Sequence, residues 1–244
     1  MGDFQIAEVL VAVLTLLGGY FGIPRLADAF YLRRQENKIL RALKALQLKL
    51  KQGQKNRDTF VKSGVFLNLK NLLWEAKEVL KNKEFLQEQL DQIINDLYSA
   101  NQFDSIQDLR AKFENYFEFS PWSWANIAIA NMSLYRWDNM PEHREYCLQA
   151  CDQSTKRLPN YGTARAVILI VHMIDASRNK QIDHDGVKKL IIQINSGDDT
   201  LVSSETYNYL MSCQELQGWK QYIDLLFELY PTEMAVMKNR SINK

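Results

Sequence analysis

Proline and glycine are scarce in this chain, with 5 prolines and 10 glycines among 244 residues. No stretch shows the sustained apolar–polar alternation of half-buried strands, whereas apolar residues recur at spacings of three and four. This pattern excludes a β-rich fold and predicts an all-α protein. Cysteine is also rare, and the odd number of three is typical of a protein in a reducing compartment.

Several motifs that mark enzymes are missing as well. The chain has no glycine-rich phosphate-binding loop, no nucleophile elbow and no HExxH zinc motif. No dense group of carboxylates stands at metal-binding spacing. The sequence therefore favours a protein that is not an enzyme and that holds no cofactor.

The chain does contain one long apolar run, residues 4–23, in which Glu8 is the only ionisable residue. Twenty residues of helix span about 30 Å, which matches the hydrocarbon core of a bilayer. A cleaved signal peptide begins with basic residues, but none precedes Arg25 in this chain. We therefore expect residues 1–24 to form a transmembrane helix that anchors the protein.

One face of this expected helix, the seam, carries small and polar residues. Lipid tails are as apolar as leucine, so membrane helices associate through close packing of small residues and through interhelical hydrogen bonds. A carboxylate within a span usually faces a bundle interior or water. The seam predicts self-association, with a water-lined pore and a plain anchor as the alternatives. Its residues are Glu8, Ala12, Thr15, Gly18, Gly19 and Gly22.

Residues 25–58 carry ten Lys or Arg and three acids, a net charge of +7, so the rest of the chain carries −6 of the total of +1. Positive residues near a span stay on the cytoplasmic side. The sequence thus predicts a single-pass protein of the cell membrane with its N-terminus outside and its C-terminal domain in the cytoplasm. Each such cation gains about 1 kcal/mol of binding free energy from anionic lipid headgroups. The acidic remainder makes nucleic acid a poorer partner than the lipid bilayer. The candidate membrane-surface cations are Arg25, Arg33, Arg34, Lys38, Arg41 and Lys44.

Apolar residues within this basic segment keep a heptad spacing. Such spacing is typical of a short coiled coil, which would continue a self-associating transmembrane bundle. An amphipathic helix that lies on the membrane surface is the other interpretation. The apolar positions are Leu32, Ile39, Leu43, Leu46 and Leu50.

Helices are predicted throughout the rest of the chain. Residues 59–120 form a helical hairpin region, and Ser120-Pro121 is a good N-cap and first-turn pair for the helix that follows. Residues 121–231 are expected to form three antiparallel helix pairs. The final segment, 232–244, is expected to be a flexible tail.

The third pair, from Ser203 to Pro231, resembles a tetratricopeptide repeat. A period in the thirties is the signature of such helical solenoids. The resemblance implies a concave groove that binds a peptide or a protein. It is carried by Tyr207, Leu210, Gly218, Trp219, Phe227 and Pro231.

His143, Cys147 and Cys151 stand at positions i, i+4 and i+8 of one predicted helix. Eight residues of helix span about 12 Å, so His143 and Cys151 cannot share one zinc ion, whose bonds are about 2.0–2.3 Å long. We expect a buried helix face here and no metal site.

Each of the three histidines follows an arginine by six or seven residues. This spacing is similar to the Arg-x4-6-His motif of HEPN ribonucleases, which are all-helical and dimerise to form a composite site. The resemblance implies that His184 acts as general acid or base and that Arg178 lies near the scissile phosphate. The pairs are Arg136/His143, Arg165/His172 and Arg178/His184, of which only the last has the usual polar residue after the arginine.

The combination of an N-terminal span, a helical domain and an Arg/His pair also resembles the small HEPN-like membrane proteins that accompany RNA-targeting CRISPR systems. That resemblance implies an oligomeric membrane pore in antiphage defence, with the seam lining or packing the pore. The sequence thus supports three hypotheses in order: a self-associating membrane protein that presents a protein-binding domain, a membrane pore, and a membrane-tethered ribonuclease.

Overall fold

The computed structural model is all-helical over the residues that it describes, which confirms the predicted fold class. The chain divides into two compact units, Met1–Leu86 and Gln87–Lys244. No helix among the described residues is both long and apolar enough to cross a membrane. The apolar run 4–23 lies outside them. The described residues are 33–34, 37–38, 41–42, 44–45, 48, 67–68, 70–72, 74–75, 83–115, 118–179, 183–196, 200–215 and 218–243.

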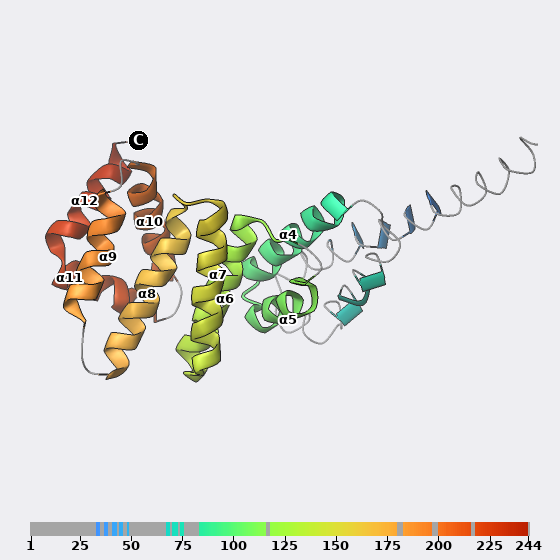
Figure 1. Cartoon of the computed structure of the whole chain (residues 1–244), viewed down its shortest axis with the longest axis horizontal. Helices are drawn as coiled ribbons and strands as arrows, with labels where there is room; N and C mark the ends of the chain where they lie inside the picture. The colour runs from blue at the N-terminus through green and yellow to red at the C-terminus, as the bar shows by residue number, and fades with distance from the viewer. Residues whose placement is uncertain are drawn as a thin grey trace, which may run out of the picture. The chain divides into compact units, whose positions relative to one another are not determined.

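Short connections join the helices of the Gln87–Lys244 unit (Figure 1). The first of these helices, α4, begins just before the boundary between the two units. The helices are α4 (Lys83–Ser99), α5 (Phe103–Phe113), α6 (Pro121–Asp138), α7 (Pro141–Arg157), α8 (Gly162–Asn179), α9 (His184–Ser196), α10 (Thr200–Ser212), α11 (Lys220–Leu229) and α12 (Pro231–Ile242), with a 3-10 turn at Cys213–Glu215.

Helix α6 forms the centre of this unit's core. It packs against α5, α7 and α8, and Figure 1 shows α6 and α7 lying side by side. Residues 127–132, Ile-Ala-Ile-Ala-Asn-Met, are all buried. A helix that is apolar on every side is stable only when neighbours cover it all round, and small alanine side chains let those neighbours approach closely.

The start of α6 lies where the sequence predicts it, and both of its ends are capped. The Ser120 hydroxyl accepts a hydrogen bond from the Ser123 N–H at 3.1 Å, and Pro121 occupies the first turn. At the other end Asn139 adopts the left-handed conformation, with φ of 60°, and its N–H donates to the Tyr135 carbonyl. The predicted cap at Ser120 is therefore confirmed.

Helix α10 does not pair in the way expected for residues 203–231. It packs mainly against α12 and α8, and α11 packs against α12 instead. The contact with α8 is close at Gly162, whose N–H donates to the Glu205 carboxylate at 3.1 Å and whose carbonyl accepts from the Thr206 hydroxyl at 3.1 Å. A Cβ at Gly162 would lie only 2.6 Å from the Glu205 Cβ, so glycine permits this crossing.

The expectation of a flexible tail at 232–244 is wrong for most of that segment. Residues 231–242 form α12, which packs against α10, α9 and α11. Met234 and Met237, three residues apart, lie on one face and are fully buried. The Ser204 hydroxyl also donates to the Arg240 carbonyl at 2.7 Å. Burial of two methionines in this way fixes the helix to the core.

Candidate functional site

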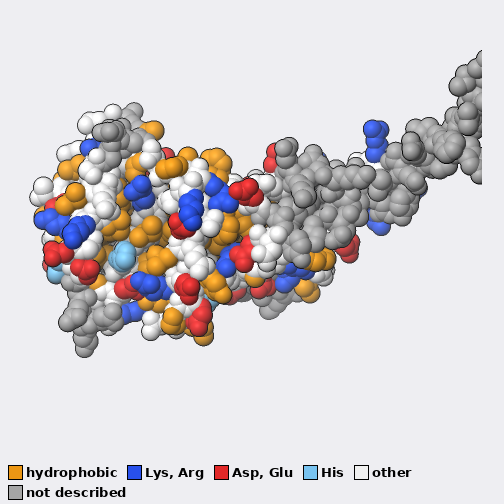
Figure 2. Space-filling view, viewed as in Figure 1, with side chains coloured by type: hydrophobic (Ala, Val, Ile, Leu, Met, Phe, Trp, Pro, Cys, Tyr) orange, Lys and Arg blue, Asp and Glu red, His pale blue; other side chains and the backbone are white. Residues whose placement is uncertain are grey.

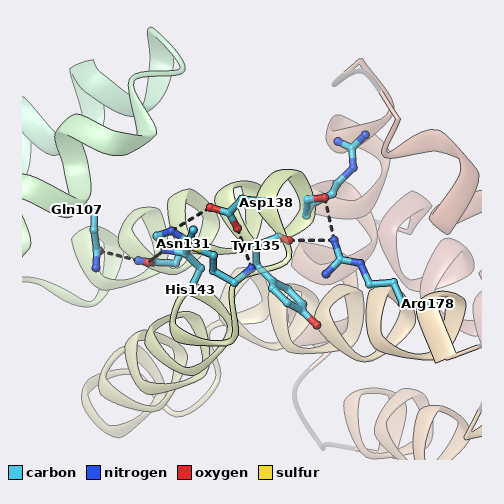
Figure 3. Close-up of polar contacts among 8 residues, drawn as sticks. Gln107, Asn131, Tyr135, Asp138, His143 and Arg178 are labelled. Carbon is cyan, nitrogen blue, oxygen red and sulfur yellow. Dashed lines mark hydrogen bonds and ion pairs between the residues drawn. The ribbon is translucent and has the colours of Figure 1, made fainter.

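Arg178, one of the two residues implied by the ribonuclease resemblance, closes the C-terminal end of α6. Its Nη2 donates to the carbonyls of Tyr135 and Arg136 at 2.9 and 2.8 Å, and its Nη1 donates to the Asn139 side chain (Figure 3). Its guanidinium also lies 4.4 Å from the centre of the Tyr135 ring. Carbonyls in the last turn of a helix lack intrahelical partners and carry partial negative charge, so a cation stabilises them.

His184, the other implied residue, begins α9 and contacts a different part of the unit. Its Nδ1 lies 3.1 Å from the Tyr230 hydroxyl, and the two rings meet edge to face. No contact among the described residues joins His184 to Arg178. Within one chain, each of these side chains has its own partners, with Arg178 capping α6 and His184 contacting Tyr230.

A partly buried polar chain that the sequence did not reveal runs from α5 to the α6–α7 turn (Figure 3). Asn131 is fully buried, and its Nδ2 donates to Gln107 Oε1 and to the Ile127 carbonyl, both at 2.9 Å. Because a carbonyl can only accept, the Ile127 contact fixes the orientation of the amide. Asn131 Oδ1 then faces His143 Nδ1 at 3.4 Å, and His143 Nε2 lies 3.2 Å from Asp138 Oδ2.

The orientation of Asn131 also determines which groups face the two ring nitrogens of His143. Both of its ring nitrogens face acceptors, Asn131 Oδ1 and the Asp138 carboxylate. A neutral imidazole has one N–H and donates only one of these bonds, whereas the imidazolium donates both. The only signal of this arrangement in the sequence is a single asparagine inside the apolar stretch 127–132.

Asp175 on α8 links that helix to both α6 and α7. Its Oδ1 accepts from the Tyr135 hydroxyl at 2.7 Å, and its Oδ2 accepts from Arg144 Nε at 2.8 Å. Burial, and then the Asp175 carboxylate beside it, raise the pKa of Tyr135. The contacts that Asp175 makes with Tyr135 and Arg144, together with those of Arg178, hold α6, α7 and α8 in their packed arrangement.

The cysteines have structural positions too. Cys147, Cys151 and Cys213 are free thiols, and all three are buried. Burial raises the pKa of Cys147 well above its ordinary value and raises that of Cys213 to about 11. A reactive cysteine needs a lowered pKa and access to solvent. Among the described residues no group of His, Cys, Asp or Glu is arranged to hold a metal ion.

The candidate membrane-surface cations fall on one side of a helix. Every described residue between 33 and 48 is helical. At about 100° per residue, the eight described residues that are exposed, which include Asn37, Ala45 and Leu48, occupy an arc of about 140°. The residues on most of the remaining circumference, Glu36 among them, lie outside the described residues. Five of the eight exposed residues are cations and none is an acid. We call the five the basic face: Arg33, Arg34, Lys38, Arg41 and Lys44.

The remaining site predictions lie outside the described residues. These are Arg25 and the whole seam, Glu8, Ala12, Thr15, Gly18, Gly19 and Gly22.

Large apolar side chains are exposed where α6 turns into α7. Trp137 is 88% exposed and Met140 is 53% exposed. Elsewhere on the visible face of this unit, acidic and basic side chains are interspersed rather than gathered by sign (Figure 2). An exposed tryptophan is unusual on a soluble surface and is typical of the residues that anchor protein–protein interfaces.

No family model, no curated protein and no solved structure matches this chain. What the fold defines is an all-α protein whose Gln87–Lys244 unit is a set of packed helices. The case for its function rests on its own residues.

Proposed function

We propose that this chain is a single-pass membrane protein that self-associates through its N-terminal helix and presents a helical domain to a protein partner. The observation that carries the proposal is the apolar run 4–23 with Glu8 as its single ionisable residue. The run is long enough to span a bilayer, and the seam offers a packing surface. The basic segment 25–58 supports a cytoplasmic position for the rest of the chain.

The exposed apolar corner at Trp137 and Met140 supports the protein-binding part of the proposal. Trp137 is the most exposed of the large apolar residues on a unit that also has an extensive buried core. Tryptophan supplies a large rigid contact area and is enriched at interface hot spots. A photo-crosslinking residue at Trp137 should therefore capture a partner in cells, while the same residue at the exposed Lys238 should not.

Self-association is tested by measuring the mass of the detergent-solubilised protein. The full chain is compared with a chain that begins at Gln35 and so lacks the apolar run. We expect an oligomeric mass for the full chain and a smaller assembly for the shortened one. Equal, monomeric masses for the two would contradict the proposal.

A second candidate function is an oligomeric membrane pore that acts in bacterial antiphage defence. The specific observation that favours it is Glu8, because a carboxylate within a span usually faces water or a bundle interior. Expression of a pore should depolarise cells, and Glu8→Leu should alter that effect. An adaptor should leave the membrane potential unchanged in both proteins. We assign no catalytic role to Arg178 or His184, whose contacts account for both side chains.

A further inference from the structure

We propose that the basic face binds the anionic headgroups of phospholipids. This inference rests on the proposed membrane anchor, and it deepens that proposal by naming the lipid class. It begins from the exposure of Arg33, Arg34, Lys38, Arg41 and Lys44, none of which has an ion-pair partner among the described residues. Five unpaired cations on one helix face form a local surface of a single sign, which selects a partner of multiple negative charge.

In the pattern of the sequence, the apolar heptad residues fall on the side opposite the basic face and so leave its cations free to bind an anionic partner. On the same helical wheel, the heptad residues from Leu32 to Leu50 fall about 170° from the centre of the basic face. These heptad residues span about 60° of the wheel, while Leu40 and Leu48 fall outside this stripe and Leu48 is exposed within the arc of the basic face. Apolar pairing and cation binding would therefore use opposite sides of one helix, so each associating copy would add five more cations.

Position in the chain favours lipid over other polyanions. Arg33 follows Pro24 by nine residues, so even a fully extended chain keeps it within about 30 Å of the end of the apolar run. Lys44 follows Arg33 by eleven residues, which is about 16 Å of helix. The negative potential of the cytoplasmic leaflet reaches about 8–10 Å from the surface and contributes about 1 kcal/mol per nearby cation. The basic face therefore gains this attraction when its helix lies along the membrane, which the short link to the apolar run permits.

The test uses the full chain in nanodiscs of phosphatidylcholine with increasing phosphatidylserine. An environment-sensitive dye on Ala45→Cys reports the face, because Ala45 is exposed on the same arc and the natural cysteines are buried. The charge variant is Arg34→Gln/Lys38→Gln/Arg41→Gln. The matched control, Lys189→Gln/Lys220→Gln/Lys238→Gln, removes the same charge from exposed positions of the other unit.

Phosphatidylserine should change the dye signal of the wild type and of the control at the same lipid fraction. At about 1 kcal/mol per cation, the charge variant should lose about 100-fold in apparent affinity. Inorganic phosphate should give no signal, because it lacks the array of charges. An unchanged response of the charge variant would overturn the inference. So would a single-stranded RNA oligonucleotide that binds in pure phosphatidylcholine more tightly than phosphatidylserine does.

The membrane anchor is checked on the same preparations by alkaline carbonate extraction. A chain that resists extraction but shows no change of dye signal with phosphatidylserine contradicts only the proposed headgroup binding. A chain that is extracted contradicts the anchor itself, whatever the dye shows.

Discussion

Arg178 supplies the clearest prediction for a single residue. Removing its guanidinium by Arg178→Ala leaves the last carbonyls of α6 and the Asn139 side chain without their donor. Hydrogen bonds from charged groups contribute about 1.5–3 kcal/mol. The free energy of unfolding should fall by about that amount, measured by near-ultraviolet circular dichroism in denaturant on the detergent-solubilised chain.

Two further variants separate capping from catalysis at this position. Arg178→Lys keeps the positive charge but not the planar fork, so it should restore part of the lost stability. Lys189→Ala, at an exposed position on α9, should change the free energy by less than about 0.5 kcal/mol. A stable Arg178→Ala protein that lacks an RNA-cleaving activity of the wild type would contradict the capping role and support the ribonuclease.

Asn131 and His143 should behave as one unit. The amide oxygen of Asn131 has His143 Nδ1 as its partner, so deleting either side chain disrupts the same contact. In a double-mutant cycle with alanine, the two losses should be non-additive by about 0.5–3 kcal/mol. Asn131→Ala combined with Lys238→Ala should instead add within about 0.5 kcal/mol. Full additivity of the Asn131 and His143 losses would show that the contact contributes nothing.

Cys213 predicts a dependence of stability on alkaline pH. Burial raises the pKa of its thiol from 9.0 to about 11, so the folded state holds a proton that the unfolded state loses first. This contribution is fully present below pH 9, and it is lost as the pH rises through 11. Two pKa units correspond to about 2–3 kcal/mol.

The variant Cys213→Ser removes this titration while keeping a small side chain. Between pH 8 and pH 11.5 its free energy of unfolding should decline less than that of the wild type, by roughly 2–3 kcal/mol. Cys147, whose pKa is also raised by burial, titrates in both proteins and cancels in the difference, whereas Tyr209 contacts Cys213 and its pKa is raised in part by it, so the difference reports this pair. Parallel pH profiles for the two proteins would contradict the burial of this thiol.

At the scale of elements, the crossing of α8 and α10 depends on Gly162. Alanine there would place its Cβ 2.7 Å from the Val202 carbonyl oxygen and 2.8 Å from the Thr206 nitrogen. These are backbone atoms that cannot rotate away, so the two helices must separate. Gly162→Ala should lower the free energy of unfolding by about 1–3 kcal/mol, although alanine normally favours a helix.

Gly186→Ala is the matched control for this prediction. The neighbours of its added Cβ belong only to the Asp183 side chain, which can rotate. The loss should therefore be smaller than at Gly162, and thermal unfolding of the two variants side by side compares them directly. A larger loss at Gly186 would contradict the account of the α8–α10 contact.

Local signals in the sequence predicted the elements that depend on neighbouring residues. Ser120 with Pro121 begins α6, because such a cap is made within a few residues of the chain. The tail was missed for the opposite reason. Residues 232–244 are mostly polar, and α12 is held by two methionines that fit against helices formed from earlier parts of the chain.

In the candidate site too, features set by neighbouring residues could be predicted, and features set by the packing of distant helices could not. The basic face could be read from the sequence, because helical periodicity alone places its cations on one side. The roles of Arg178 and Asn131 could not, because Gln107 lies 24 residues from Asn131, Tyr135 lies 43 residues from Arg178, and these partners meet only when α5, α6 and α8 pack. Spacing between Arg178 and His184 suggested a pair, whereas packing gives each residue its own partner.

At the scale of the whole molecule, charge asymmetry predicts how the chain lies across the membrane. Ten Lys or Arg follow the apolar run within residues 25–58, and only Asp3 and the terminal amine precede it. If the proposed anchor spans the membrane, the positive-inside rule predicts residue 2 outside the cell and the Gln87–Lys244 unit inside. Gly2→Cys and the exposed Lys238→Cys provide one reporter on each side.

A membrane-impermeant maleimide should label Gly2→Cys on intact cells and should label Lys238→Cys only after the membrane is opened. The three natural cysteines are buried and add little background, which the unsubstituted chain measures. If the pattern is inverted, the C-terminal unit faces outward, and the basic face then meets the outer leaflet, which is poor in the anionic lipids that it is proposed to bind. Orientation and headgroup binding are thus linked, because a cytoplasmic unit is the only arrangement in which both can hold.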